Sequence, residues 1–275
     1  MVTPGRLGSA SLTSLLDGPD GPIEYLTTGN GEPRTVFAHG LAGSIDTTRP
    51  FGSGVRGSRT FFHFRGHGAS AAPETPWTYA ALAGELRVVA DHVGATRALG
   101  VSMGAGALCH WLEREPKRFE RVVFALPAVL DTPRSDAAME RLVAMAQAAD
   151  DRDVEGMADL LAEEQPAGLR DTRAVRHWCD QQAHRLVGTP VSRALRSLPH
   201  EVAMDDREAL SGIPVPVLVL AQEGDPAHPV HIAEEIAGRV PHARLEVLPE
   251  GGIMWRHRAR VRELVGRFLC GDPDD

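Results

Sequence analysis

Short apolar segments alternate with helical patterns along most of this 275-residue chain, and that alternation constrains its fold more than any other feature. The segments that favour strands are residues 23–26, 34–38, 60–64, 97–101, 122–126, 215–220 and 244–248. Several of these segments are apolar on both faces, as strands of a parallel sheet covered on both sides are. We therefore predict an α/β fold, with a mostly parallel central sheet flanked by helices.

The pattern changes between residues 133 and 212, where no strand signal occurs. Helical periodicity dominates this part, at residues 136–149, 153–164 and 172–186. The insertion follows a strand, and in α/β folds ligands bind beside the carboxyl ends of the strands. We therefore predict a core made of residues 1–132 and 213–275 and a helical cap made of residues 133–212, which either shapes a pocket or is purely structural.

Residues 100–104, with the sequence Gly-Val-Ser-Met-Gly, join one predicted strand to a helical pattern at residues 105–115. A G-x-S-x-G motif in this setting puts the serine on a sharp turn, where small flanking residues expose its hydroxyl. The next amide, Met103 N–H, would lie at a helix N-terminus, where it can stabilise a developing oxyanion. The plainer alternative is a glycine-rich turn with a serine that caps the helix.

Other motifs follow in a regular order along the chain. Residues 39–41 (His-Gly-Leu) end a strand, and there the Leu41 N–H can supply a second oxyanion donor. Residues 65–68 (Arg-Gly-His-Gly) form a turn after the next strand. Residues 223–225 (Glu-Gly-Asp) follow a late apolar strand. Several motifs in one order are more specific than any one of them alone.

These motifs, together with residues 100–104, make the chain resemble the α/β-hydrolase superfamily in its single-domain, cap-bearing, bacterial form. The resemblance extends from about residue 23 to residue 269. It implies that Ser102 is the nucleophile and that Asp225 is the acid of a catalytic triad. An aspartate in a Gly-Asp-Pro turn can also bond its own backbone, so a structural role for Asp225 is the alternative.

The expected triad histidine is missing from its usual place. The family carries it in the turn after the last strand, and the corresponding position here, at or beside Gly251, has none. The sequence therefore predicts a non-standard or incomplete triad. The remaining candidates for the base are His228, three residues beyond Asp225, and His257, past the turn. An ordinary loop histidine is the favoured interpretation of His228, and His257 is disfavoured because a helical turn separates it from the usual position.

Three other histidines are weaker candidates for the base. His39 is expected to hold the oxyanion loop rather than to reach Ser102. His177 and His184 belong to a predicted cap helix, from which they could point into the pocket or face solvent. A serine hydroxyl needs a base within about 3 Å to become a good nucleophile. The identity of the base therefore decides the function.

The leading hypothesis is a serine hydrolase that acts on a small or medium acyl ester, thioester or related compound. One alternative is a non-hydrolytic enzyme on the same fold, a lyase, isomerase or cyclase that uses the oxyanion donors to stabilise an enolate. Another is a catalytically inactive protein that binds a ligand in the same crevice. Fold alone does not discriminate among them.

Composition restricts the classes of partner and the cellular compartment that we expect. The formal net charge of −8 and the lack of basic clusters argue against nucleic acid and anionic membrane, leaving a small-molecule substrate. Three widely spaced cysteines (Cys109, Cys179, Cys270) predict neither a disulfide framework nor a metal site. No leader and no membrane-spanning apolar run are evident, so we expect a cytoplasmic protein without cofactor. A homo-oligomer is left open.

Overall fold

The computed structural model describes residues 13–271. The N-terminal residues that bear on the expected absence of a leader lie mostly outside this range, as does the tail at residues 272–275. Among the described helices, none combines the length and the apolar character needed to span a bilayer.

Within the described residues, one sheet has the strand order β1-β2-β4-β3-β5-β6-β7-β8. Its strands are β1 (Ser14–Gly18), β2 (Gly21–Thr28), β3 (Arg34–Ala38), β4 (Ser58–Phe62), β5 (Arg97–Val101), β6 (Arg121–Ala125), β7 (Val217–Gln222) and β8 (Ala243–Leu248). Strand β2 pairs antiparallel with β1 and β4, and all other neighbours are parallel. Both the α/β class and the mostly parallel sheet predicted from the sequence are confirmed.

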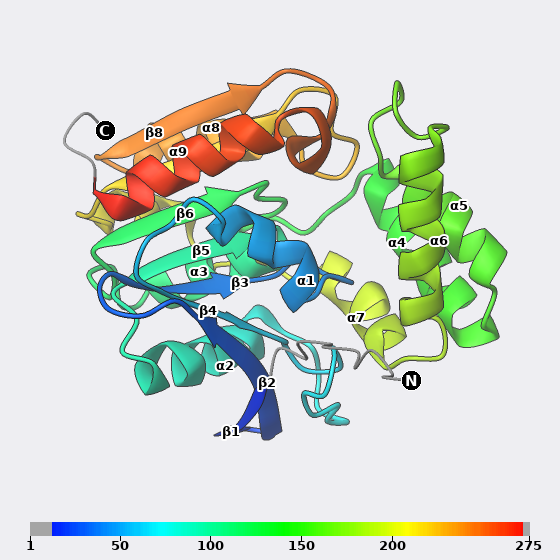
Figure 1. Cartoon of the computed structure of the whole chain (residues 1–275), viewed down its shortest axis with the longest axis horizontal. Helices are drawn as coiled ribbons and strands as arrows, with labels where there is room; N and C mark the ends of the chain where they lie inside the picture. Colours follow the sequence, from blue (N-terminus) through cyan, green and yellow to red (C-terminus); the bar gives the residue numbers. More distant parts are fainter. Residues whose placement is uncertain (1–12, 272–275) are drawn as a thin grey trace, which may run out of the picture.

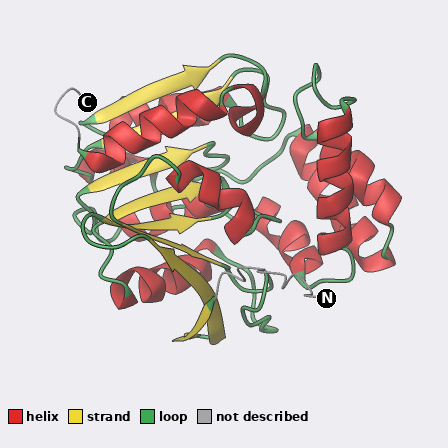
Figure 2. Cartoon of the chain, viewed as in Figure 1, coloured by secondary structure: helices red, strands yellow, loops and turns green. Residues whose placement is uncertain are grey.

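Helices cover both faces of this sheet, as Figure 2 shows in red around yellow strands. The helices are α1 (Ile45–Thr48), α2 (Tyr79–His92), α3 (Met103–Leu112), α4 (Ala137–Asp151), α5 (Val154–Glu163), α6 (Arg173–Leu186), α7 (Val191–Ser197), α8 (Val230–Arg239) and α9 (Arg258–Cys270). Successive side chains of β7 point to opposite faces of the sheet, and each face carries its own apolar core. Val217 and Val219 pack with α2, α3 and α8, whereas Leu218 and Leu220 pack with α9 on the opposite face.

Sequence patterns missed β1 and α8. Strand β1 has no run of buried residues, and Leu15 is 61% exposed; the strand is held by pairing with β2, where Leu16 lies opposite Ile23. Helix α8 buries only Ala233 and Ile236. Strand β1 therefore lacks the apolar run that identifies a core strand, whereas α8 spaces Val230, Ala233 and Ile236 at helical intervals over only ten residues, close to the shortest length that such a pattern identifies.

Helices α4–α7, which we call the cap helices, follow β6 and precede β7. They enclose an apolar cluster of their own, which includes Met145, Met157, Val175 and Leu195. Figure 1 shows α4, α5 and α6 grouped on the side toward which the parallel strands point. The carboxyl ends of the strands, where the sequence motifs lie, therefore face the cap helices.

Candidate active site

The turn between β5 and α3 exposes Ser102 in a strained conformation. Its φ of 49° and ψ of −107° lie outside the regions that most residues adopt. A Cβ on Gly100 would lie 2.4 Å from Gly104 O, and one on Gly104 would lie 2.5 Å from Ala38 O. Only glycine fits at either position, so the two glycines of the motif are a steric requirement of the turn. Strain of this kind persists only where the surrounding structure enforces it.

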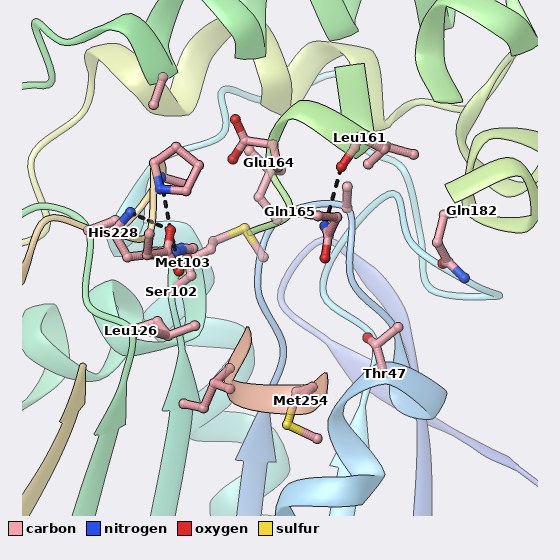
Figure 3. Close-up of a pocket in the computed structure, with 18 of the residues that line it drawn as sticks. Thr47, Ser102, Met103, Leu126, Leu161, Glu164, Gln165, Gln182, His228 and Met254 are labelled. Carbon is pink, nitrogen blue, oxygen red and sulfur yellow. Dashed lines mark hydrogen bonds and ion pairs between the residues drawn. The ribbon is translucent and has the colours of Figure 1, made fainter. Parts of the chain in front are cut away.

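Ser102, His228 and Asp225 form a continuous chain of hydrogen bonds (Figure 3 shows the serine–histidine contact). Ser102 Oγ lies 2.9 Å from His228 Nε2, and His228 Nδ1 lies 3.0 Å from Asp225 Oδ1. A carboxylate can only accept, so Nδ1 carries the proton and Nε2 is left to accept from the serine hydroxyl. The side chains of His228 and Asp225 are only 18% and 12% exposed. The imidazole is therefore oriented as a general base for Ser102 would be.

Asp225 also organises the loop that carries His228. Its Oδ1 accepts hydrogen bonds from the backbone N–H of Ala227 at 2.9 Å and of His228 at 3.0 Å. Burial would raise the pKa of this carboxyl, but its electrostatic attraction to the His228 ring and the hydrogen bonds from that ring and from the two amides outweigh burial and lower the pKa. The carboxylate of Asp225 thus forms the turn with its own backbone and also accepts from the His228 ring, so the structural role and the expected triad role are compatible. The lowered pKa keeps this carboxylate ionised.

The two residues predicted to donate to an oxyanion line the same pocket as the serine. Met103 is the first residue of α3, so its N–H has no carbonyl one turn earlier in the helix to bond. The loop that carries Leu41 contacts the turn between β5 and α3, since a Cβ on Gly40 would lie 3.4 Å from Ser102 Cβ. Leu41, Ser102 and Met103 all line one pocket. Figure 3 shows Met103 beside Ser102 at the wall of this pocket.

His39 holds the Leu41 loop and does not bond Ser102. Its Nε2 accepts from the Phe64 N–H at 3.0 Å, and its Nδ1–H donates to Gly40 O at 2.7 Å. The ring is completely buried, and burial keeps its pKa well below the usual value, so the ring is neutral.

The Arg-Gly-His-Gly turn is a buried polar support behind this loop. Arg65 donates to Glu85 at 2.7 Å and to Asp20 at 2.6 Å, and its side chain is 1% exposed. His67 Nδ1–H donates to Arg65 O at 2.9 Å, and burial lowers the pKa of His67 to about 4. Removing one partner of such a buried ion pair is strongly destabilising, so these residues serve the architecture of the loops.

The structure places the two candidate bases differently. The ring of His228 bridges Ser102 and Asp225 rather than lying free in its loop. His257, the other candidate base, occupies the N-cap position of α9, and its Nε2–H donates to Glu250 O at 3.2 Å. After β8, Gly251 leads into a π-helical turn over Gly252–Arg256. This turn separates His257 from the position at Gly251 where the family carries its histidine.

His177 and His184 on α6 are exposed and face solvent. Their rings lie near Gln181 and Asp180 of the same helix.

One sequence signal could have identified the histidine. Asp225 and His228 are three residues apart on the segment that leaves β7, and the carboxyl end of β7 lies at the same sheet edge as Ser102. The ligand crevice of an α/β sheet forms at this edge. An Asp-x-x-His segment there can present the acid and the base together, although the family pattern directs attention to the next loop.

The pocket above Ser102 is roomy and largely apolar. It has a volume of about 620 Å³ and is bounded by the core loops and by all four cap helices. Apolar side chains from the cap helices include Leu142, Met145, Leu161 and Leu195. A pocket of this size admits a small or medium organic molecule. Among the residues that the structure describes, no cluster of three or more His, Cys, Asp or Glu side chains could hold a metal ion.

Comparisons with known proteins agree with this fold. A family model described as "alpha/beta hydrolase fold" matches residues 33–254. A curated relative, 3-oxoadipate enol-lactonase 2 of Acinetobacter baylyi, is 27% identical over 189 residues, which is 67% of this chain and 67% of the relative.

Two solved structures illustrate the likeness of fold. A thermophilic esterase from Thermogutta terrifontis is 19% identical with a TM-score of 0.75, over 94% of this chain and 98% of that one. The enol-lactonase from Burkholderia xenovorans is 23% identical with a TM-score of 0.73, over 93% of this chain and 99% of that one. At these identities the structures support the fold alone.

Proposed function

Because the chain belongs to the alpha/beta hydrolase fold family, we propose that it is a serine hydrolase that cleaves an ester or lactone of a small or medium acyl compound. Ser102 is the nucleophile, His228 the general base and Asp225 the acid that orients it. The observation that carries this proposal is the 2.9 Å contact between Ser102 Oγ and His228 Nε2. The triad is complete in this proposal, with its histidine on the loop after β7.

The first half-reaction forms an acyl-enzyme. Ser102 Oγ attacks the carbonyl carbon of the substrate while His228 Nε2 takes the hydroxyl proton. Negative charge develops on the carbonyl oxygen, and the N–H groups of Met103 and Leu41 stabilise it. When the tetrahedral intermediate collapses, the carbon–oxygen bond to the leaving group breaks and His228 gives its proton to the departing alkoxide or enolate oxygen. In a lactone that oxygen stays tethered to the acyl group.

The second half-reaction reverses the roles. A water molecule attacks the acyl carbon while His228 takes its proton, and the same two amides stabilise the second oxyanion. The bond to Ser102 Oγ then breaks, the proton returns to the serine, and the carboxylic acid leaves as a carboxylate with release of a proton. Asp225 stabilises the imidazolium in both halves and remains ionised throughout.

The substrate class rests on the pocket and on the relatives. The apolar cap lining favours a substrate with a hydrocarbon part. The similar proteins are an esterase and enol-lactonases, and cleavage of a lactone is the same acyl transfer with the leaving group retained. Short linear esters and small lactones are therefore the first substrates to try.

The alternatives are less well supported. A catalytically inactive binding protein has no need of an imidazole oriented on the hydroxyl of a strained serine. A lyase or isomerase that works through the oxyanion donors alone would not depend on Ser102. Catalysis that survives Ser102→Ala would support that second alternative.

The test is active-site labelling combined with turnover. We expect a fluorophosphonate probe to label the wild-type protein and not Ser102→Ala. Wild type should hydrolyse p-nitrophenyl butyrate or a small lactone, and His228→Ala should lose on the order of 10⁴-fold or more in kcat, since loss of a triad histidine is among the costliest changes in serine hydrolases.

His257→Ala is the matched control, because it removes the other candidate histidine from a helix end outside the bond chain. It should keep labelling and kcat within about threefold of wild type. Equal loss in both variants, or no labelling of wild type with no turnover of either substrate class, would contradict the proposal.

A further inference from the structure

The acid and the base of the proposed triad share one short loop, and residues at the start of the cap hold that loop. The segment 225–229 belongs to the connection between β7 and α8, which spans residues 223–229. Two of its carbonyl groups accept hydrogen bonds from arginines near the start of the cap: Arg134 Nη2 donates to Ala227 O at 2.7 Å, and Arg141 Nη2 donates to Pro226 O at 2.9 Å. These carbonyls lie on the two residues between Asp225 and His228.

A carboxylate of the cap orients each of these arginines. Arg134 donates to both oxygens of Asp136, the N-cap residue of α4, at 3.1 and 2.8 Å. Arg141 forms an ion pair with Glu164 at the end of α5. The side chains of Arg134 and Arg141 are only 9% and 17% exposed. A planar guanidinium can donate to a carboxylate and to a carbonyl at once, which a lysine cannot do in one rigid geometry.

We propose that Arg134 and Arg141 are positioning residues that keep His228 within hydrogen-bond reach of Ser102, and that the cap helices thereby set the efficiency of the base. This inference rests on the proposed function. A loop that bears both the acid and the base depends on one backbone conformation, whereas a triad spread over two loops does not. A displacement of about 1 Å in a catalytic group can cost about 100-fold in rate.

The competing explanation is a loop that needs no outside support. Asp225 Oδ1 already ties three donors together, and Pro226 and Pro229 restrict the backbone on either side. In that case the arginines would only attach the cap to the core. The two explanations differ in what happens to the loop and to kcat when one arginine is lost.

The experiment uses the full-length chain with Arg134→Gln, Arg141→Gln and Arg141→Lys. Arg196→Gln is the matched control, because Arg196 is a cap arginine bonded to Asp150 and Gln147 and to nothing in the loop. Hydrogen exchange of the peptide spanning residues 225–229 follows the amides of Ala227 and His228, which bond Asp225. Steady-state hydrolysis of p-nitrophenyl butyrate separates kcat from KM.

We expect each glutamine variant to exchange this segment at least about 10-fold faster and to lose about 10- to 100-fold in kcat, with KM within about threefold. Arg141→Lys should recover part of both losses, since it keeps the charge and one donor. Arg196→Gln should match wild type in both measurements.

Unchanged exchange in both glutamine variants would overturn the inference, whatever their activity. Faster exchange with unchanged kcat would also overturn it, because the efficiency of His228 as a base would then not depend on the hydrogen bonds from the two arginines to the loop. If Arg141→Lys is the only variant that folds, its exchange rate and its kcat test the inference, and a value equal to wild type in either measurement would overturn it. A wild type without hydrolase activity would refute the proposed function, while the exchange result would still decide whether the arginines hold the loop.

Discussion

Replacement of Asp225 by asparagine tests the electrostatic core of the proposed mechanism. In most triads this change also disturbs the histidine tautomer, because the amide can turn its NH₂ group toward the ring. Here Oδ1 accepts from two backbone amides as well as from the His228 ring. The carbonyl oxygen of an asparagine is therefore expected to keep that place, so Asp225→Asn removes the charge and leaves the hydrogen bonds.

The size of the effect follows from the contact distance. Unit charges about 4 Å apart attract by about 4 kcal/mol at an effective dielectric constant of about 20. The 3.0 Å contact between Nδ1 and Oδ1 places the two groups in this range. The imidazole is neutral before reaction and charged in the transition state, so the attraction acts on the rate. Because each 1.36 kcal/mol is a factor of ten, kcat should fall by about 10³.

The assay compares kcat and KM of wild type, Asp225→Asn and Asp225→Ala with p-nitrophenyl butyrate. Asp225→Ala also breaks the three hydrogen bonds of Oδ1, so it should lose more than Asp225→Asn and loosen the loop. Asp206→Asn is the control: Asp206 makes a similar turn, accepting from the Glu208 N–H at 2.9 Å. It should stay within about twofold of wild type.

A loss smaller than about 10-fold in Asp225→Asn would refute the electrostatic role. A loss equal to that of Asp225→Ala would mean that the hydrogen bonds, rather than the charge, carry the effect of this residue. Either result would require a different account of how His228 is activated.

Two further predictions concern stability. Gly104→Ala should destabilise the fold by about 1–3 kcal/mol, because its Cβ would press on Ala38 O. Gly84→Ala on α2 meets nothing within 4 Å and should stabilise the fold by about 0.5–1 kcal/mol. Denaturant unfolding measures the sign of both changes. The ion pair with Arg207 lowers the pKa of Asp131 from 3.8 to about 2, so the stability lost in Asp131→Asn should be complete above about pH 5, should shrink as pH falls through the unfolded value and should vanish below about pH 2. Unfolding of both proteins at several pH values measures the difference, and a difference that does not change with pH would contradict this prediction.

Much of the site was predictable because it follows from local backbone requirements. The glycines at positions 100 and 104 are needed for steric reasons that act within a few residues of Ser102 and at Ala38. A G-x-S-x-G segment between a strand and a helix therefore predicts its own geometry. The position of Asp225 was predictable for a similar reason, since a turn after a buried strand opens at the sheet edge.

The contact of His228 with Ser102 was not predictable in the same way. Its sequence neighbourhood, Ala-His-Pro, is that of many surface loops, and only the pairing of β5, β6 and β7 brings its loop to Ser102. The contacts of Arg134 and Arg141 with that loop join residues 93 and 85 positions apart along the chain. No periodicity or motif reports such contacts.

The amino-acid sequence by itself determined the α/β class, the strained serine and the absence of a histidine in the turn after β8. These features depend on apolar periodicity and on backbone sterics, which act between near neighbours in the chain. Only the tertiary structure decided which imidazole meets Ser102 and what holds it there. Those contacts depend on the strand order and on the packing of the cap against the core, which bring together segments that are distant in the sequence.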